Sequence, residues 1–188
     1  HGKSTHVSTP HLGVDALYIA SQIVVAVQGL VTRRTSPTEP VIIGIGKLNA
    51  GTTYNAVAAF AEMEGTTRTI SQESRDRVRA QVSETAQSIA ALYGGTAEVE
   101  WTDFAAALVN DPQVCEEAAR VVDELLGAGH VVTDRELSLS GDNFAEFELY
   151  KPGAYAYLGT GNPDLPHTMI TNHNGGFDVD ENALVTGA

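Results

Sequence analysis

The opening segment, HGKSTHVSTPH, contains residue types that suit two different chemistries. One is phosphate binding, because Gly2-Lys3-Ser4-Thr5 resembles the end of a P-loop. The other is metal binding or hydrolysis, because the segment contains three histidines, His1, His6 and His11. A P-loop needs an earlier glycine, a strand before the Gly-Lys pair and a helix directly after it. Only one residue precedes the tetrapeptide and Thr9-Pro10 follows it, so the sequence argues against nucleotide binding.

The remaining histidines provide one further candidate. None of the six histidines has HExxH spacing or the Cys and His spacing of a closed zinc site. His173 differs from the others because it lies in a polar, glycine-rich segment, Asn172-His173-Asn174-Gly175-Gly176, close to several carboxylates. A lone loop histidine is more often a solvated hydrogen-bonding residue, so spacing alone leaves His173 a candidate.

Arg68 is a candidate for binding an anionic ligand. It lies in an alternating segment that is typical of a half-exposed strand, in a protein with an acidic excess. A guanidinium can hold a carboxylate through two parallel hydrogen bonds. The alternative is a surface ion pair with Glu62 or Glu64 on the same face of the strand.

Composition narrows the class of protein. The chain of 188 residues is 43% hydrophobic, which suffices for an ordinary core, and its net charge of -13 argues against nucleic acid and anionic membranes as partners. The single cysteine, Cys115, excludes an internal disulfide and favours a reducing, cytoplasmic location. The longest apolar stretch, residues 19–31, is interrupted by polar residues, which indicates a buried helix rather than a membrane span.

Periodicity predicts the elements that position these candidates. The segments alternate between helical and strand periods in this order: a helix over 14–31, strands over 41–45 and 60–70, a helix from the Ser71 N-cap to Gly94-Gly95, and a strand over 97–101. With a strand before the first helix, this order predicts an α+β fold, in which a four-stranded antiparallel sheet carries two helices on one face, as in ferredoxin-like domains.

A second unit is expected after Asn110-Asp111-Pro112. An amphipathic helix over 114–126 is followed by short apolar runs between glycine, proline and asparagine residues. So few residues with so little regular structure form a poor independent core. We therefore predict two parts, residues 1–109 and residues 110–188, the second being an incomplete α/β domain.

Several motifs, in collinear order, resemble those of the hippurate hydrolase and indole-acetyl-amino-acid amidohydrolase family. These enzymes are similar to the aminoacylase and glutamate carboxypeptidase metallopeptidases. Residues 2–16 resemble the family's GKGGHxSxPHxGxDA, and the later matches are Gly51-Thr52-Thr53-Tyr54-Asn55, Glu64-Gly65-Thr66-Thr67-Arg68-Thr69, Pro152-Gly153-Ala154 with Leu158-Gly159, and His173 with Phe177-Asp178-Val179-Asp180-Glu181.

The resemblance implies a metal-dependent amidohydrolase that cleaves the amide bond of small N-acyl amino acids. Residues 1–109 would be a lid that also forms a homodimer, and residues 110–188 the C-terminal part of the catalytic domain. His6 would stabilise the oxyanion in the partner subunit, Asn55 and Arg68 would bind the substrate's carbonyl and carboxylate, and His173 would be a ligand of one of two divalent ions, zinc or manganese.

The sequence also departs from the family pattern. The family's other metal ligands and its general-base glutamate would lie upstream of His1, and its GSEDF segment is altered to Ser140-Gly141-Asp142-Asn143-Phe144. The proline of the family's NxIP is also absent after Asn55. We therefore expect this chain alone to bind no metal tightly and to hydrolyse nothing. The alternative is a non-catalytic dimerisation or interaction module derived from the lid.

Overall fold

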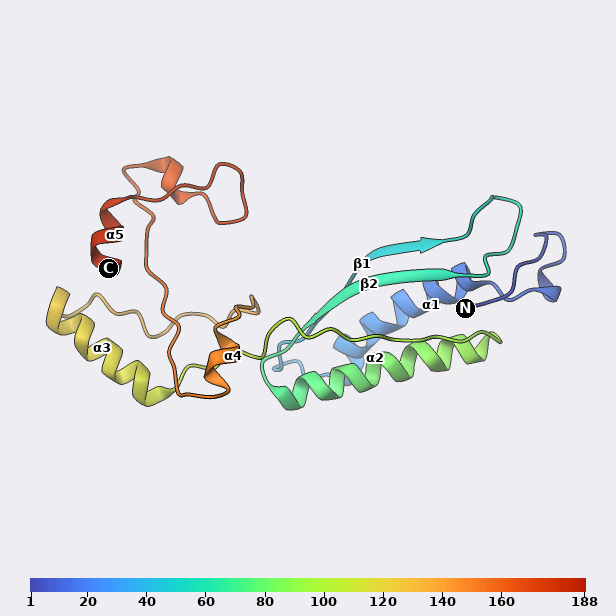
Figure 1. Ribbon diagram of the computed structural model, residues 1–188, viewed down its shortest axis with the longest axis horizontal. Coiled ribbons are helices and arrows are strands. Elements are labelled where there is room, and N and C mark those ends of the chain that lie inside the picture. The colour runs from blue at the N-terminus through green and yellow to red at the C-terminus, as the bar shows by residue number, and fades with distance from the viewer.

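The computed structural model describes residues 1–188 and places two helices on one face of a β-hairpin. Helix α1 (Ala16–Gly29) and helix α2 (Gln72–Leu92) pack against strands β1 (Ile42–Ala50) and β2 (Ala61–Arg68) (Figure 1). The hydrophobic core lies between these layers, where Ile19, Ile23 and Val27 of α1 meet Ile43 of β1 and Val78 of α2.

Helix α1 begins at an N-cap and forms the centre of the core. The Asp15 carboxylate accepts hydrogen bonds from the backbone N–H groups of Leu17, at 3.0 Å, and Tyr18, at 3.2 Å, which satisfies two otherwise unpaired donors. A π-helical turn, Leu30–Arg34, follows it. The segment Ala16–Arg34 is long and apolar enough to cross a membrane by composition, with a mean hydropathy of 1.3. Its buried face nevertheless packs in the core, as predicted for a core helix.

The hairpin has a regular antiparallel register with one irregularity. Ile42 pairs with Arg68 at one end and Ala50 with Ala61 at the other, and the register shifts between Ile45 and Lys47. The two strands predicted over 41–45 and 60–70 are thus confirmed. Arg68 and the 51–60 connection consequently lie at opposite ends of the hairpin.

Helix α2 has the N-terminus that the sequence predicts. The Ser71 hydroxyl accepts a hydrogen bond from the Ser74 backbone N–H at 3.1 Å. The helix ends at Tyr93, after which Gly94 adopts a φ of 79° that disfavours residues with a Cβ. Glu39, from the connection before β1, accepts hydrogen bonds from Ser74 and Arg77, and these hold the pKa of its carboxyl below the usual value.

The predicted four-stranded sheet is wrong, because the sheet contains β1 and β2 alone. Residues 97–101 do alternate, with Ala97 and Val99 packed against the core, but they form no strand. His1 and Thr96 exchange two backbone hydrogen bonds, of 2.8 and 3.1 Å, and beyond them a cavity separates the segment from β2. Alternation of apolar and polar residues indicates that one face of a segment is buried. A strand also needs a neighbouring backbone about 4.8 Å away, with which it forms hydrogen bonds.

Side chains tie this extended segment to α2 instead. Asp103 accepts hydrogen bonds from both Arg75 and Arg79, and the Trp101 indole donates to the Ser83 hydroxyl at 3.1 Å. The Arg79 guanidinium also lies 5.5 Å from the centre of the Trp101 ring. The segment therefore runs along the helix without pairing to the sheet (Figure 1).

Residues 110–188 contain helices and loops but no strand, so the α/β character expected for them is also wrong in this chain. The elements, in order, are α3 (Pro112–Leu126), α4 (Ala145–Glu148), a 3-10 turn (Pro166–Met169) and α5 (Asn182–Gly187). Only Ala145 and Thr168 are buried, and α3 has no buried residue although its apolar residues follow a helical period. Without a packed apolar layer, nothing holds strands together here.

Candidate active-site residues

The structure brings His6 and Asn55 together from segments that are distant in the sequence. The Val7 backbone N–H donates to the Asn55 carbonyl at 3.2 Å, and the Val57 N–H donates to the Thr5 carbonyl at 2.8 Å. His6 therefore lies opposite Ala56 in an isolated antiparallel bridge, directly beside Asn55. Both side chains are exposed, so both can reach a group outside this chain.

Contacts with Ser8 determine which nitrogen of His6 is the donor. The Ser8 backbone N–H lies 3.2 Å from Nδ1 of His6, and the Ser8 hydroxyl lies 2.7 Å from the same atom. Because a backbone N–H can only donate, Nδ1 is the acceptor, and the neutral ring carries its proton on Nε2. Nε2–H is thus free to donate a hydrogen bond. Sequence reasoning identified His6 but missed Ser8, whose signal is its position two residues after the histidine.

The Asn55 side chain is oriented by its own loop. Its Oδ1 accepts a hydrogen bond from the Thr53 hydroxyl at 3.1 Å, which leaves the Nδ2 hydrogens for a ligand. An exposed amide donor beside an exposed imidazole donor suits a carbonyl or oxyanion oxygen.

Arg68 lies at the far end of β2, away from His6 and Asn55. One end of its guanidinium is held by the strand itself, because Nη1 donates to the Thr66 hydroxyl at 2.7 Å and to the Thr67 carbonyl at 3.2 Å. The side chain forms no ion pair, and Glu64 pairs with Lys47 instead. The alternative expectation, a surface ion pair between Arg68 and Glu62 or Glu64, is therefore wrong.

Strand geometry separates Arg68 from the other two residues. The run from Ala61 to Arg68 spans about 24 Å at about 3.4 Å per residue, and Asn55 precedes that run. A small substrate is much shorter than this strand. One chain therefore does not bring His6, Asn55 and Arg68 to the same substrate.

His173 lies in an exposed loop of the C-terminal part. Its backbone φ of 63° is in the left-handed region, where residues other than glycine are uncommon. The neighbouring turn is closed by Asn174, whose Oδ1 accepts from the Gly176 N–H at 2.9 Å. The nearest histidine–carboxylate pair in this part, His167 and Asp178, is 3.7 Å apart and does not include His173.

The residues of this chain do not fit a two-metal site by themselves. Nowhere in residues 1–188 do three or more His, Cys, Asp or Glu side chains gather closely enough to hold a metal ion. A two-metal centre requires several ligands around ions about 3.5–4 Å apart. His173 can contribute at most one of them.

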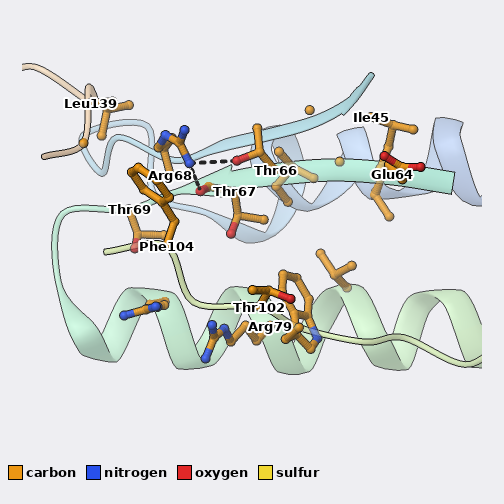
Figure 2. Close-up of a pocket in the computed structure, with 18 of the residues that line it drawn as sticks. Ile45, Glu64, Thr66, Thr67, Arg68, Thr69, Arg79, Thr102, Phe104 and Leu139 are labelled. Carbon is orange, nitrogen blue, oxygen red and sulfur yellow. Dashed lines mark hydrogen bonds between the residues drawn. The ribbon is translucent and has the colours of Figure 1, made fainter. Parts of the chain in front are cut away.

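A cavity of about 1250 Å³ lies beside Arg68. Its walls are the strands β1 and β2, the helices α1 and α2, the extended segment 96–110 and the loop 135–142. Figure 2 shows the Arg68 guanidinium at the end of β2, with Leu139 of the loop and Phe104 of the extended segment lining the same cavity. Sequence reasoning missed both apolar residues, because neither belongs to a motif and the cavity forms only when several distant segments meet.

Comparison with known proteins identifies relatives along the whole chain. Residues 1–94 match the family described as the peptidase dimerisation domain. Thermostable carboxypeptidase 1 of Saccharolobus solfataricus is 33% identical over 189 residues, covering 100% of this chain and 47% of that protein. The N-acetyl-L-cysteine deacetylase of Bacillus subtilis is 33% identical over 184 residues, covering 98% of this chain and 42% of that protein.

A solved structure has the same arrangement. A Bacillus subtilis protein described as a dinuclear metal binding peptidase from the M20 family superposes with a TM-score of 0.74 at 30% sequence identity. The match covers 92% of this chain and 43% of that one. The chain thus spans about half the length of the relatives that it matches.

Proposed function

The chain belongs to the M20 peptidase family, with residues 1–94 matching its dimerisation domain, and we propose that it is part of a metal-dependent amidohydrolase. The complete protein would cleave the amide bond of N-acyl amino acids or similar small substrates. Relatives named as a carboxypeptidase and a deacetylase support amide hydrolysis. Residues 1–109 would be the lid and dimerisation part, and residues 110–188 a portion of the catalytic domain.

The observation that carries the proposal is the pair of contacts that Ser8 makes with Nδ1 of His6. With Nδ1 occupied by Ser8, the Nε2–H is held as a donor towards an external oxygen. When a nucleophile attacks an amide carbonyl, negative charge develops on the oxygen only as the tetrahedral intermediate forms. A preoriented donor at that oxygen stabilises the transition state more than the substrate.

The separation within one chain supports a proposal in which these residues belong to two subunits of a homodimer. His6 and Asn55 of one subunit would act on the substrate carbonyl, and Arg68 of the other subunit would hold the substrate carboxylate. About 24 Å of strand lies between the two groups within one chain, so a small substrate contacts both only across an interface. The match to a dimerisation domain supports this arrangement.

Subunit mixing of the complete protein tests the assignment. We expect His6→Ala to lower kcat by about 100- to 1000-fold, the usual effect of losing one oxyanion donor. Arg68→Gln should mainly weaken substrate binding. When the two impaired variants are mixed, allowed to exchange subunits and assayed well below KM, each heterodimer contains one site with both residues intact, so about a quarter of the original activity should return. No recovery, despite measured subunit exchange, would show that both residues act within one subunit.

The metal ions, zinc or manganese, would be held mostly by residues outside this chain, with His173 as a single ligand. We therefore expect the 188-residue chain alone to hydrolyse neither hippurate nor related N-acyl amino acids, with or without added metal. Turnover by the chain that a chelator abolishes would contradict this expectation. A cytoplasmic location belongs to the same proposal, because a single cysteine, Cys115, forms no internal disulfide.

The second candidate function is a non-catalytic dimerisation module, which the match of residues 1–94 favours. In that case the complete protein would self-associate but would lack amidase activity. Sedimentation of the chain at micromolar concentration separates the two properties. A chain that stays monomeric would count against the module, whereas a dimeric protein without amidase activity in its complete form would favour it.

A further inference from the structure

The turn that carries His6 is closed by Thr9. The Thr9 backbone N–H donates to the His6 carbonyl at 2.9 Å, and the Thr9 hydroxyl donates to the same oxygen at 3.2 Å. The Thr5 hydroxyl lies 3.1 Å from the Thr9 hydroxyl. Because the single hydroxyl hydrogen of Thr9 is directed at the carbonyl, Thr5 donates to Thr9. The hydrogen bonds therefore run in one direction, from Thr5 through Thr9 to the backbone of His6.

The same turn supports the His6 ring. All hydrogen bonds of the ring are with Ser8, whose backbone N–H and hydroxyl lie 3.2 and 2.7 Å from Nδ1. Ser8 lies between His6 and Thr9, so closure of the turn fixes the position from which Ser8 reaches Nδ1. An exposed side chain without such support changes rotamer within picoseconds to nanoseconds. The direction of the His6 Nε2–H therefore depends on the closed turn.

The backbone on both sides of His6 is held independently of the Thr9 hydroxyl. The Val7 N–H donates to the Asn55 carbonyl, and the Val57 N–H donates to the Thr5 carbonyl. Loss of the Thr9 hydroxyl should therefore leave His6 beside Asn55 and release only the orientation of its ring. Orientation of the donor can thus be separated from folding.

We propose that Thr9 is a positioning residue for amide hydrolysis, which acts through Ser8 to orient the Nε2–H of His6. The inference rests on the proposed role of His6 at the oxyanion and names a residue on which that role depends. Thr9 itself touches no reacting atom. Its loss should lower kcat rather than raise KM, because the donor is needed most where negative charge develops in the transition state.

Substitutions at Thr9 in the complete protein test the proposal. Thr9→Val removes the hydroxyl and keeps the branched shape, and it should lower kcat about fivefold, the usual effect of one hydrogen bond, with KM nearly unchanged. Thr9→Ser restores the hydroxyl and should recover most of kcat. The matched control is Thr32→Val, which removes a hydroxyl that donates to the Gln28 carbonyl at 3.3 Å and should leave kcat unchanged.

A double-mutant cycle distinguishes orientation of His6 from a structural role. In a His6→Ala background, Thr9→Val should cause no further loss of kcat, because the group that Thr9 orients is absent. A similar loss in both backgrounds, or an unchanged kcat of the single Thr9→Val variant, would overturn the proposal. If His6→Ala itself leaves kcat unchanged, the proposed role of His6 at the oxyanion is wrong, and the role of Thr9 with it.

NMR of the 188-residue chain provides a readout that does not depend on activity. Thr9→Val should increase the motion of the His6 side chain, while the backbone amide signals of Val7 and Val57 stay in place. An equally ordered ring in both proteins would contradict the proposed positioning, even if kcat falls.

Discussion

A pair of substitutions in α1 tests whether this helix is the centre of the core. Val27 is 1% exposed and belongs to the core cluster, whereas Val25, two residues earlier in the same helix, is 70% exposed. We propose to compare Val27→Ala with Val25→Ala. The two changes remove the same atoms from the same helix, so their difference isolates burial from helix propensity.

The expected difference follows from the buried groups. Losing two buried methyl groups costs about 1.6 kcal/mol of the free energy of unfolding, at about 0.8 kcal/mol each. An unrelaxed cavity of about 40 Å³ adds about 1 kcal/mol. The higher helix propensity of alanine offsets about 0.5 kcal/mol in both variants. Val27→Ala should therefore destabilise the chain by about 2 kcal/mol, and Val25→Ala should leave it unchanged within about 0.5 kcal/mol.

Urea denaturation followed by far-UV circular dichroism would measure both variants at one protein concentration, because self-association changes apparent stability. A loss of about 2 kcal/mol should also lower Tm by roughly 10 °C in a unit of about 100 residues. Equal effects of the two variants, or a larger effect of Val25→Ala, would refute the packing of α1 described here. A helix inserted in a membrane, rather than packed on the hairpin, would have no reason to distinguish these two positions in this way.

Three further predictions concern the elements around the core. Ser71→Ala removes the N-cap of α2 and should cost about 1 kcal/mol of unfolding free energy, measurable by urea denaturation; no change would mean that the cap is dispensable. The hydrogen bond from Ser74, together with an arginine of α2, lowers the pKa of the Glu39 carboxyl from its ordinary 4.5. The stabilisation of the fold by the Glu39 carboxylate is therefore complete above pH 4.5 and is lost as the pH falls through the lowered folded-state pKa. Glu39→Gln should flatten this acid limb of stability against pH, and an unchanged limb would contradict the assignment. Gly65→Ala would place a Cβ 2.5 Å from a carbonyl oxygen of β1 and should destabilise the hairpin by about 1–3 kcal/mol, whereas Gly46→Ala, with open space around it, serves as the matched control.

Local signals located the helices well. The cap at Ser71 and the glycine at position 94 act within one turn of the helix that they bound, and both have the expected roles. The helix expected over 114–126 begins at Pro112 because Asp111 caps it and proline suits the first turn. Such predictions succeed because each depends on only a few neighbouring residues.

The sheet could not be predicted from local sequence patterns alone. The alternation of residues 97–101 correctly indicated that Ala97 and Val99 face the core. It carried no information on whether another backbone lies alongside. Arg75 and Arg79 of α2 hold the segment through Asp103, and a cavity separates it from β2. Strand pairing is a property of two segments, so the pattern in one of them does not decide it.

For the candidate site, the sequence by itself determined residue types, and through motifs it singled out His6, Asn55, Arg68 and His173. Only the tertiary structure decided that His6 lies beside Asn55, that Ser8 leaves its Nε2–H free, and that Arg68 is at the far end of β2. The physical reason is that chemistry is carried by side-chain type, which is local, whereas a site is made by the approach of distant segments. That approach depends on packing and backbone pairing across the whole chain.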